Sequence, residues 1–187
     1  MDYILAIFVG IGLSISAGFR LFTPLFVLSL TTKLGWMELG AGFEWLSSTP
    51  ALIGFGVAVV IELVCNYIPV VDNFMKMIAA PFALMAGTLL TVSVIGVDDS
   101  PFLSWALALI AGGGAATSAQ LTSTAVRGTS TVTTAGIVNP VVAIIEEIGA
   151  WMMSIVSIIF PIVAVILVIV FMVIFIKMFS TIRARFS

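Results

Sequence analysis

The apolar run from residue 4 to residue 30 constrains the fold most, because it is long enough to cross a bilayer. It reads ILAIFVGIGLSISAGFRLFTPLFVLSL, which exceeds the roughly 20 residues that a spanning helix needs. Gly10, Ser14 and Gly18 recur every four residues and therefore share one helical face. Small residues on one face allow another backbone to approach closely. The run predicts a membrane helix that packs tightly against a neighbour.

The same run contains Arg20 and Pro24, which interrupt its apolar character. Pro24 has no N–H group, so the carbonyl of Arg20 loses its usual helical partner. A charged guanidinium and a freed carbonyl then lie together in a segment where lipid offers no hydrogen bond. We therefore expect Arg20 to find its partners inside the protein, with Glu62 or Glu146 as the acid.

The composition places the whole chain in the membrane. Hydrophobic residues make up 61% of the 187 and charged residues 9%, and the mean hydropathy is +1.30, values that soluble domains do not reach. No cleavable signal peptide is expected, because Met1 and Asp2 supply no basic residue. The lone Cys65 cannot form an intramolecular disulfide. We predict a single all-α transmembrane domain spanning 1–187.

Residues that are scarce narrow the function. Histidine is absent, which removes histidine-based zinc sites and Ser-His or Cys-His nucleophilic pairs. Seven Lys and Arg residues cannot form a basic surface for nucleic acid. We therefore expect no nucleic-acid partner, no cofactor and no enzyme activity. A carboxylate site for a hard metal ion, made by Glu62, Asp72, Glu146 and Glu147, is conceivable, but no spacing is diagnostic of one.

About six transmembrane helices are predicted from the apolar segments. They span roughly 3–30, 51–70, 75–97, 101–126, 132–153 and 155–179. If both termini are cytoplasmic, that side carries Lys76, Arg127 and three basic residues of the C-terminal tail, against Lys33 opposite. The positive-inside rule therefore predicts that both termini are cytoplasmic.

An internal repeat is also detectable. Aligning residues 6–17 with 108–119 gives five identities in twelve positions, although chance competes because Gly and Ala are abundant. In each half a small-residue helix precedes a helix with an acid, which is Glu62 in one and Glu146 with Glu147 in the other. Three segments per repeat imply inverted topology. We predict two three-helix repeats, about 1–98 and 99–187, with Gly/Ser-rich first and fourth helices that are candidates for a break.

The stretch 112–140 is unusually polar for a membrane segment. It contains ten Ser and Thr residues together with Gln120, Arg127 and Asn139. One interpretation is that the hydroxyls bond backbone within the helix and hold neighbouring helices together. The other is a broken or re-entrant hairpin that lines a polar cavity. The sequence is compatible with both.

The acidic residues can also be interpreted in two ways. Glu62 and Asn66 are four residues apart and share a helical face, whereas the adjacent Glu146 and Glu147 point in different directions. A carboxylate in the membrane needs a partner. It either forms a structural ion pair with Arg20 or Arg127, or belongs to a substrate or proton site at the repeat interface.

Three motifs resemble a bacterial integral-membrane family catalogued as domain of unknown function 4126. They are SAGFRLFTPLFVLSL (16–30), ELVCNYIPVVDN (62–73), and the Gly-rich helix that leads to VRG, NP and EE (126–147). The resemblance implies a small multi-pass fold in the bacterial inner membrane and no established activity. It marks a polar signature of Arg20, Glu62, Asp72, Asn73, Arg127 and Glu146. The family pattern has an Asp-type residue where Asn66 stands here.

Our leading interpretation is a small inner-membrane transporter or permease, with lipid around it and a homo-oligomeric state. Its substrate would be a small ion or an anionic solute held at the repeat interface. The alternative is a non-transporting scaffold or lipid-binding subunit, and an enzyme acting on lipid ranks third. The candidate site residues are the polar ones nearest that interface: Ser16, Arg20, Glu62, Asn66, Ser118, Gln120, Arg127, Asn139, Glu146 and Glu147.

Overall fold

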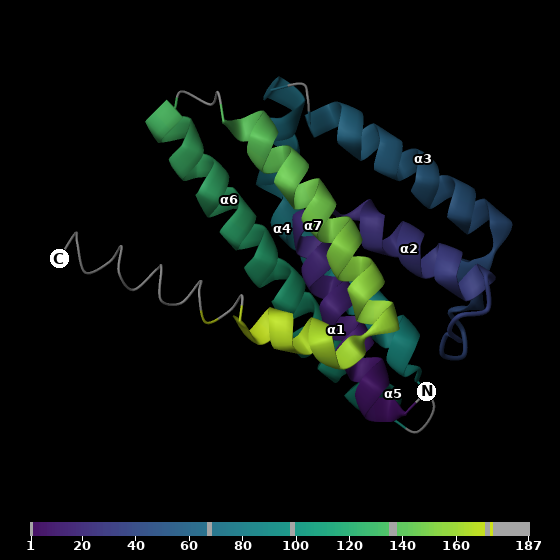
Figure 1. Cartoon of the computed structure of the whole chain (residues 1–187). Coiled ribbons are helices and arrows are strands. Elements are labelled where there is room, and N and C mark those ends of the chain that lie inside the picture. The colour runs from purple at the N-terminus through teal and green to yellow at the C-terminus, as the bar shows by residue number, and fades with distance from the viewer. Residues whose placement is uncertain (1, 67–68, 98–99, 135–137, 171–172, 174–187) are drawn as a thin grey trace.

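The computed structural model describes residues 2–66, 69–97, 100–134, 138–170 and 173, and this part of the chain is helical without strands (Figure 1). The elements are α1 (Tyr3–Phe19), α2 (Phe22–Lys33), the 3₁₀ turn η1 (Glu44–Ser47), α3 (Thr49–Asn66), α4 (Pro69–Ile95), α5 (Pro101–Leu107), the π-helix η2 (Ala108–Gly113), α6 (Gly114–Thr134) and α7 (Asn139–Ile159). A short helix, Pro161–Val170, follows α7.

Four helices in the described part are long and apolar enough to cross a membrane. They cover Thr49–Asn66, Ile78–Ile95, Pro101–Thr133 and Asn139–Ile159. Two further apolar helices, Tyr3–Phe19 and Pro161–Val170, are shorter than a full span. The predicted all-α membrane class is therefore confirmed, with four of the six predicted spans meeting the length of a crossing helix.

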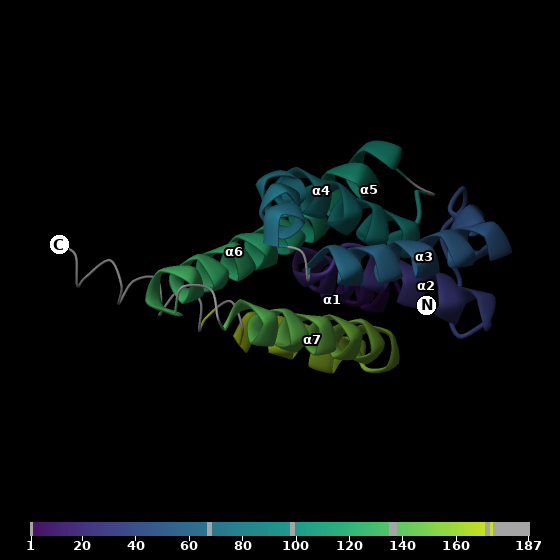
Figure 2. The same cartoon turned by 90° about the horizontal axis from the view of Figure 1, so that it is seen from above.

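Helix α1 lies at the centre, between α4 on one side and α7 on the other (Figure 2). Its glycines permit this, because a Cβ atom on Gly10 would come within 2.9 Å of the Thr91 Cα in α4. A Cβ on Gly12 would overlap Ser157 of α7, and one on Gly18 would overlap the Ala116 carbonyl of α6. The predicted close approach is present, but three different helices make it.

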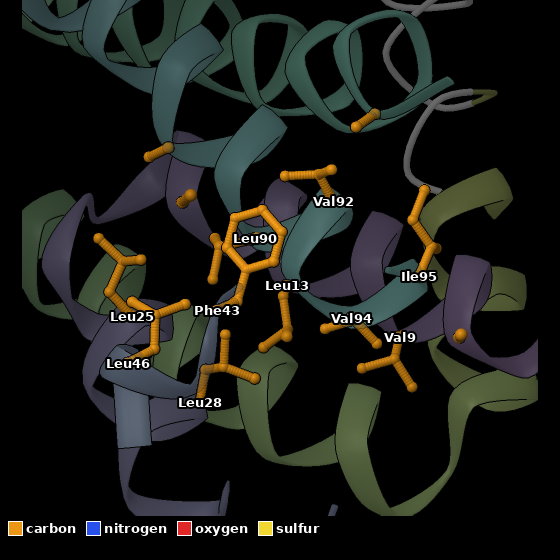
Figure 3. Packing of buried hydrophobic residues seen from close by; sticks show 14 of the residues in the cluster. Val9, Leu13, Leu25, Leu28, Phe43, Leu46, Leu90, Val92, Val94 and Ile95 are labelled. Atoms are coloured by element: carbon orange, nitrogen blue, oxygen red, sulfur yellow. The ribbon is translucent and has the colours of Figure 1, made fainter. Parts of the chain in front are cut away.

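Large apolar side chains fill the space beside α1. Val9, Leu13, Leu28, Leu46 and Leu90 come from α1, α2, η1 and α4 and are fully buried (Figure 3). This core joins α1, α2 and η1 to α4. It leaves the end of α1 near Arg20 facing α6 and α7, where the polar residues gather.

The outer surface differs from the buried face of α1, because it exposes large apolar side chains. No residue of α3 is buried, and Ile53, Val57 and Val60 are each more than half exposed. Exposed apolar side chains along a whole helix suit contact with lipid tails. The lipid-facing surface of this fold therefore carries large aliphatic side chains, whereas many small and hydroxylated residues lie inside together with the leucine core.

The polar stretch around residues 112–134 forms continuous helix. Residues 101–134 run through α5, η2 and α6 without a break, so the hairpin interpretation is wrong for this part, and the predicted boundary between 126 and 132 is wrong as well. Thr117, Thr122 and Thr129 each donate to the carbonyl four residues earlier. The hydroxyls thus satisfy themselves within the helix, as the first interpretation held.

Candidate functional site

The predicted first segment is interrupted at Arg20, and this break creates the site. Helix α1 ends at Phe19 and α2 begins at Phe22, while Arg20 has extended backbone angles of φ −142° and ψ 117°. Pro24 lies in the first turn of α2, where its missing N–H has no helical partner in any case. Proline therefore favours the start of a new helix at this point.

Glu62 of α3 caps the new helix. Its Oε1 accepts the Leu21 N–H at 2.9 Å and its Oε2 accepts the Phe22 N–H at 3.1 Å. The first N–H groups of a helix lack partners within it, and the helix dipole favours negative charge there. One carboxylate from a distant segment thus satisfies two backbone donors. It supplies the cap that Leu21, the residue before the helix, has no side-chain oxygen to provide.

Arg20 is buried and turns toward α7. Its Nη2 donates to the Ala143 carbonyl at 2.8 Å, and its Nε lies 3.1 Å from Oε2 of Glu147. This Nε contact is an ion pair without the alignment of a hydrogen bond. We expected Glu62 or Glu146 as the partner, and that prediction is wrong. Glu62 is engaged by the α2 backbone, and Glu146 points toward α6.

Glu147 also accepts hydrogen bonds from two further side chains. Trp151, one turn later on α7, donates its indole N–H to Oε1 of Glu147 at 2.8 Å, and the Thr23 hydroxyl lies at 3.4 Å from the same oxygen. Arg20 lies in the helix break and Thr23 in the first turn of α2, so Glu147 connects the break and the start of α2 to α7. This pair fixes the direction in which the broken segment leaves α1.

A second ion pair joins α6 to α7. Arg127 directs Nε at 2.9 Å and also Nη2 to Oε2 of Glu146, and the Ser123 hydroxyl donates to Oε1 of the same residue. Ser123 and Arg127 are four residues apart on α6 and therefore face Glu146 together. Sequence reasoning missed Ser123, although its spacing from Arg127 was a signal that could have identified it.

A cavity of about 270 Å³ lies between the break and the second ion pair. Its polar lining consists of Arg20, Glu62, Asn66, Gln120, Ser123, Arg127 and Glu146. Six of these seven were candidate site residues from the sequence. Its apolar lining includes Phe19, Phe22, Met75, Ile78 and Phe82, which no sequence pattern singled out. The cavity brings together residues from α1, α2, α3, α4, α6 and α7 and from the Arg20–Leu21 link.

The remaining candidates lie elsewhere. The Ser16 hydroxyl bonds the Ala150 carbonyl and Ser154 at 2.7 and 2.6 Å, which ties α1 to α7. Ser118 bonds the Gly114 carbonyl of its own helix, and Asn139 donates to Thr131. Glu147 borders a smaller cavity of about 170 Å³ that Arg20 also lines.

Two residues of the family signature, and the conceivable metal site, remain to be placed. Asp72 and Asn73 belong to α4, and their side chains are outside the described part of the structure. Among the residues that the structure describes, no three His, Cys, Asp or Glu side chains come together in a way that could hold a metal ion.

Four apolar helices of spanning length, with large aliphatic side chains exposed on their outer faces, define an integral membrane protein of the all-helical class. The chain belongs to the family described as Domain of unknown function (DUF4126), whose model matches residues 7–181. This confirms the resemblance found in the sequence. No curated protein and no solved structure matches the chain.

Proposed function

We propose that this protein is a small membrane transporter or permease and that its solute site is the cavity at the α1–α2 break. The observation that carries the proposal is the cavity itself, which combines Arg20, Glu62, Arg127 and Glu146 among apolar helices. Ionisable groups at membrane depth are costly, and they mark solute and ion pathways more often than structural joints. Glu62 and Glu146 are the candidates for coupling solute movement to protons.

The broken helix supports the same proposal. Transporters commonly place solute sites where a membrane helix is interrupted, because the exposed ends of the half-helices supply oriented dipoles. Here α1 stops and α2 starts at the cavity wall, with Arg20 and Leu21 in the link. The candidate residues Asn66 and Gln120 add amide groups to the same wall.

The proposal includes the finer architecture inferred from the sequence. It has six spans in two inverted repeats, with α1–α2 equivalent to α5–α6. The contact between Gly18 and Ala116 supports this pairing, because it joins the two segments that the alignment equates. We further propose a homo-oligomer in the bacterial inner membrane with both termini in the cytoplasm.

A lipid-binding subunit is the second candidate, and a different cavity favours it. An apolar groove of about 680 Å³ runs between α4 and α5 and is lined by Met85, Phe102, Trp105 and Leu109. A groove of this kind suits an acyl chain. On this alternative the two Arg–Glu pairs are structural joints and no solute crosses.

Replacing Glu62 and Glu146 singly by Gln separates the two candidates. A transporter should keep its fold and lose pH-dependent flux in liposomes that contain a pH-sensitive dye. Glu38→Gln, in an exposed loop position, is the matched control and should leave flux unchanged. A scaffold would instead lose thermal stability in both variants and show no flux in the wild type. That second result would end the transporter proposal.

A further inference from the structure

We infer that the cavity accepts a small organic cation with an apolar body and that Glu62 is its counter-ion. This inference rests on the proposed transporter, and it names the class of solute. It differs from the anionic solute that the two arginines suggested in the sequence. Three properties of the cavity support it, which are the pairing of its charges, the nature of its walls and its size.

The charges around the cavity do not balance among the residues that the structure describes. Arg20 is paired with Glu147, and Arg127 is paired with Glu146. Within the same described residues Glu62 forms no ion pair, although Arg20 attracts it from a longer distance, and its oxygens accept the backbone N–H groups of Leu21 and Phe22. In this group two guanidinium groups therefore face three carboxylates, and the unmatched negative charge lies on the cavity wall.

An anionic solute would meet this arrangement unfavourably. It would bring a second negative charge close to Glu62, in a region where lipid and protein screen charge weakly. An anion that replaced Glu146 or Glu147 at its arginine would leave that carboxylate without its partner. A cation needs neither change, because it meets Glu62 directly.

The apolar residues that line the cavity indicate the structure of the solute's uncharged part. Phe19, Phe22 and Phe82 line the cavity together with Met75 and Ile78. Aromatic rings attract cations, and the effect grows when water is excluded. The apolar side chains suit a hydrocarbon body rather than a hydrated metal ion. A carboxylate next to three phenylalanines is the chemistry that recognises an alkyl- or arylammonium group.

The volume limits the size of the solute. The cavity holds about 270 Å³, equivalent to roughly nine water molecules at their share of liquid volume. One aromatic ring with a short substituted ammonium group is compatible with such a space. Benzyltrimethylammonium is therefore a suitable probe and benzenesulfonate a suitable counterpart, because both carry one ring and a permanent charge of opposite sign.

Calorimetric titration of the purified full chain tests the inference. Wild type and Glu38→Gln should bind benzyltrimethylammonium with equal affinity and show no heat with benzenesulfonate. Glu62→Gln should bind the ammonium at least about tenfold more weakly, because it loses the charge in a weakly screened site. Equal ammonium binding by Glu62→Gln, binding of the sulfonate instead, or binding of neither probe would overturn the inference.

A second variant and an uptake assay make the result of the titration interpretable. If Glu62→Gln does not fold, Phe82→Leu replaces it, because Phe82 is 44% exposed and its loss removes a ring with little packing. This variant should weaken ammonium binding several-fold and leave the melting temperature near that of the wild type. An unchanged ammonium affinity in Phe82→Leu would overturn the aromatic part of the site.

Uptake into liposomes distinguishes this inference from the proposed function. Ammonium uptake that Glu62→Gln abolishes supports both. Uptake of the sulfonate without the ammonium retains a transporter and overturns the cation site. Ammonium binding without uptake of either probe supports the cation site and ends the transporter proposal.

Discussion

Two arginine–glutamate pairs reach α7 at consecutive residues, and they differ in what holds each arginine. Arg20 lies in the extended link between two helices, and its guanidinium contacts both the Ala143 carbonyl and Glu147. Arg127 lies within the regular helix α6 and directs both contacting nitrogens to one oxygen of Glu146. The first pair therefore sets the path of the chain, whereas the second joins two helices that are already formed.

Arg20→Ala should lower stability more than any change at the second pair. It leaves the partly buried Glu147 carboxylate without its cation, and it also removes the donor to Ala143. Loss of one partner of a buried pair typically costs about 3–5 kcal/mol. We expect a marked fall in melting temperature in detergent. Arg20→Lys should recover little, because an ammonium group lacks the planar fork that reaches two acceptors. Wild-type stability in Arg20→Ala would show that the pair does not hold the break.

Arg127→Ala should cost less, about 1–3 kcal/mol. Glu146 is the more buried of the two acids, but it keeps its hydrogen bond from Ser123, and the two helices that this pair joins are already formed. Adding Glu146→Ala should restore part of the loss, and the resulting double-mutant cycle measures the coupling of the pair. If Arg127→Ala proves more damaging than Arg20→Ala, the proposed difference between the two pairs is reversed.

Gly18→Ala tests the packing beside the first pair. The new Cβ would overlap the Ala116 carbonyl and approach the Ala119 side chain, so α1 and α6 would have to separate. Overpacking of this kind typically costs about 1–3 kcal/mol. The melting temperature should fall, and chemical cross-linking between cysteines placed on these two helices should become less efficient. No change in either measurement would argue against close α1–α6 contact in the membrane.

Gly128→Ala is the matched change beside the second pair and should have the smallest effect. A Cβ there meets nothing within 4 Å. Alanine also favours an exposed helix over glycine by up to about 1 kcal/mol, so stability should stay constant or rise slightly. A clear loss of stability would indicate that another molecule, such as a second copy of the chain, packs against this face.

The membrane class, the small-residue face of α1 and the polar side chains of the site could be predicted from the sequence. These follow from local rules, because chain length in a bilayer, helical periodicity and proline chemistry each depend on few residues. The position of the break follows from Pro24 in the same way. None of this requires knowledge of which helices are neighbours.

The pairing of acids with arginines could not be predicted so directly. Glu146 and Glu147 differ by about 100° around the helix axis, so the rotation of α7 decides which arginine each one meets. The buried face of α7 contains Ala143, Ala150 and Ser154 as well as Glu146, and that face turns Glu147 toward Arg20. The phenylalanines of the cavity were missed for a similar reason, since lining a space depends on tertiary packing.

The cap that Glu62 provides for α2 also has a consequence for synthesis at the ribosome. The Leu21 N–H and its acceptor are 41 residues apart in sequence, so the nascent chain contains all of α2 well before its cap exists. We expect the first turn of α2 to remain frayed until α3 has left the translocon. Amide hydrogen exchange at Leu21 and Phe22 should therefore be fast in chains arrested before residue 62 and slow in longer ones. In this protein α3 therefore supplies the acceptors that cap the N-terminus of α2.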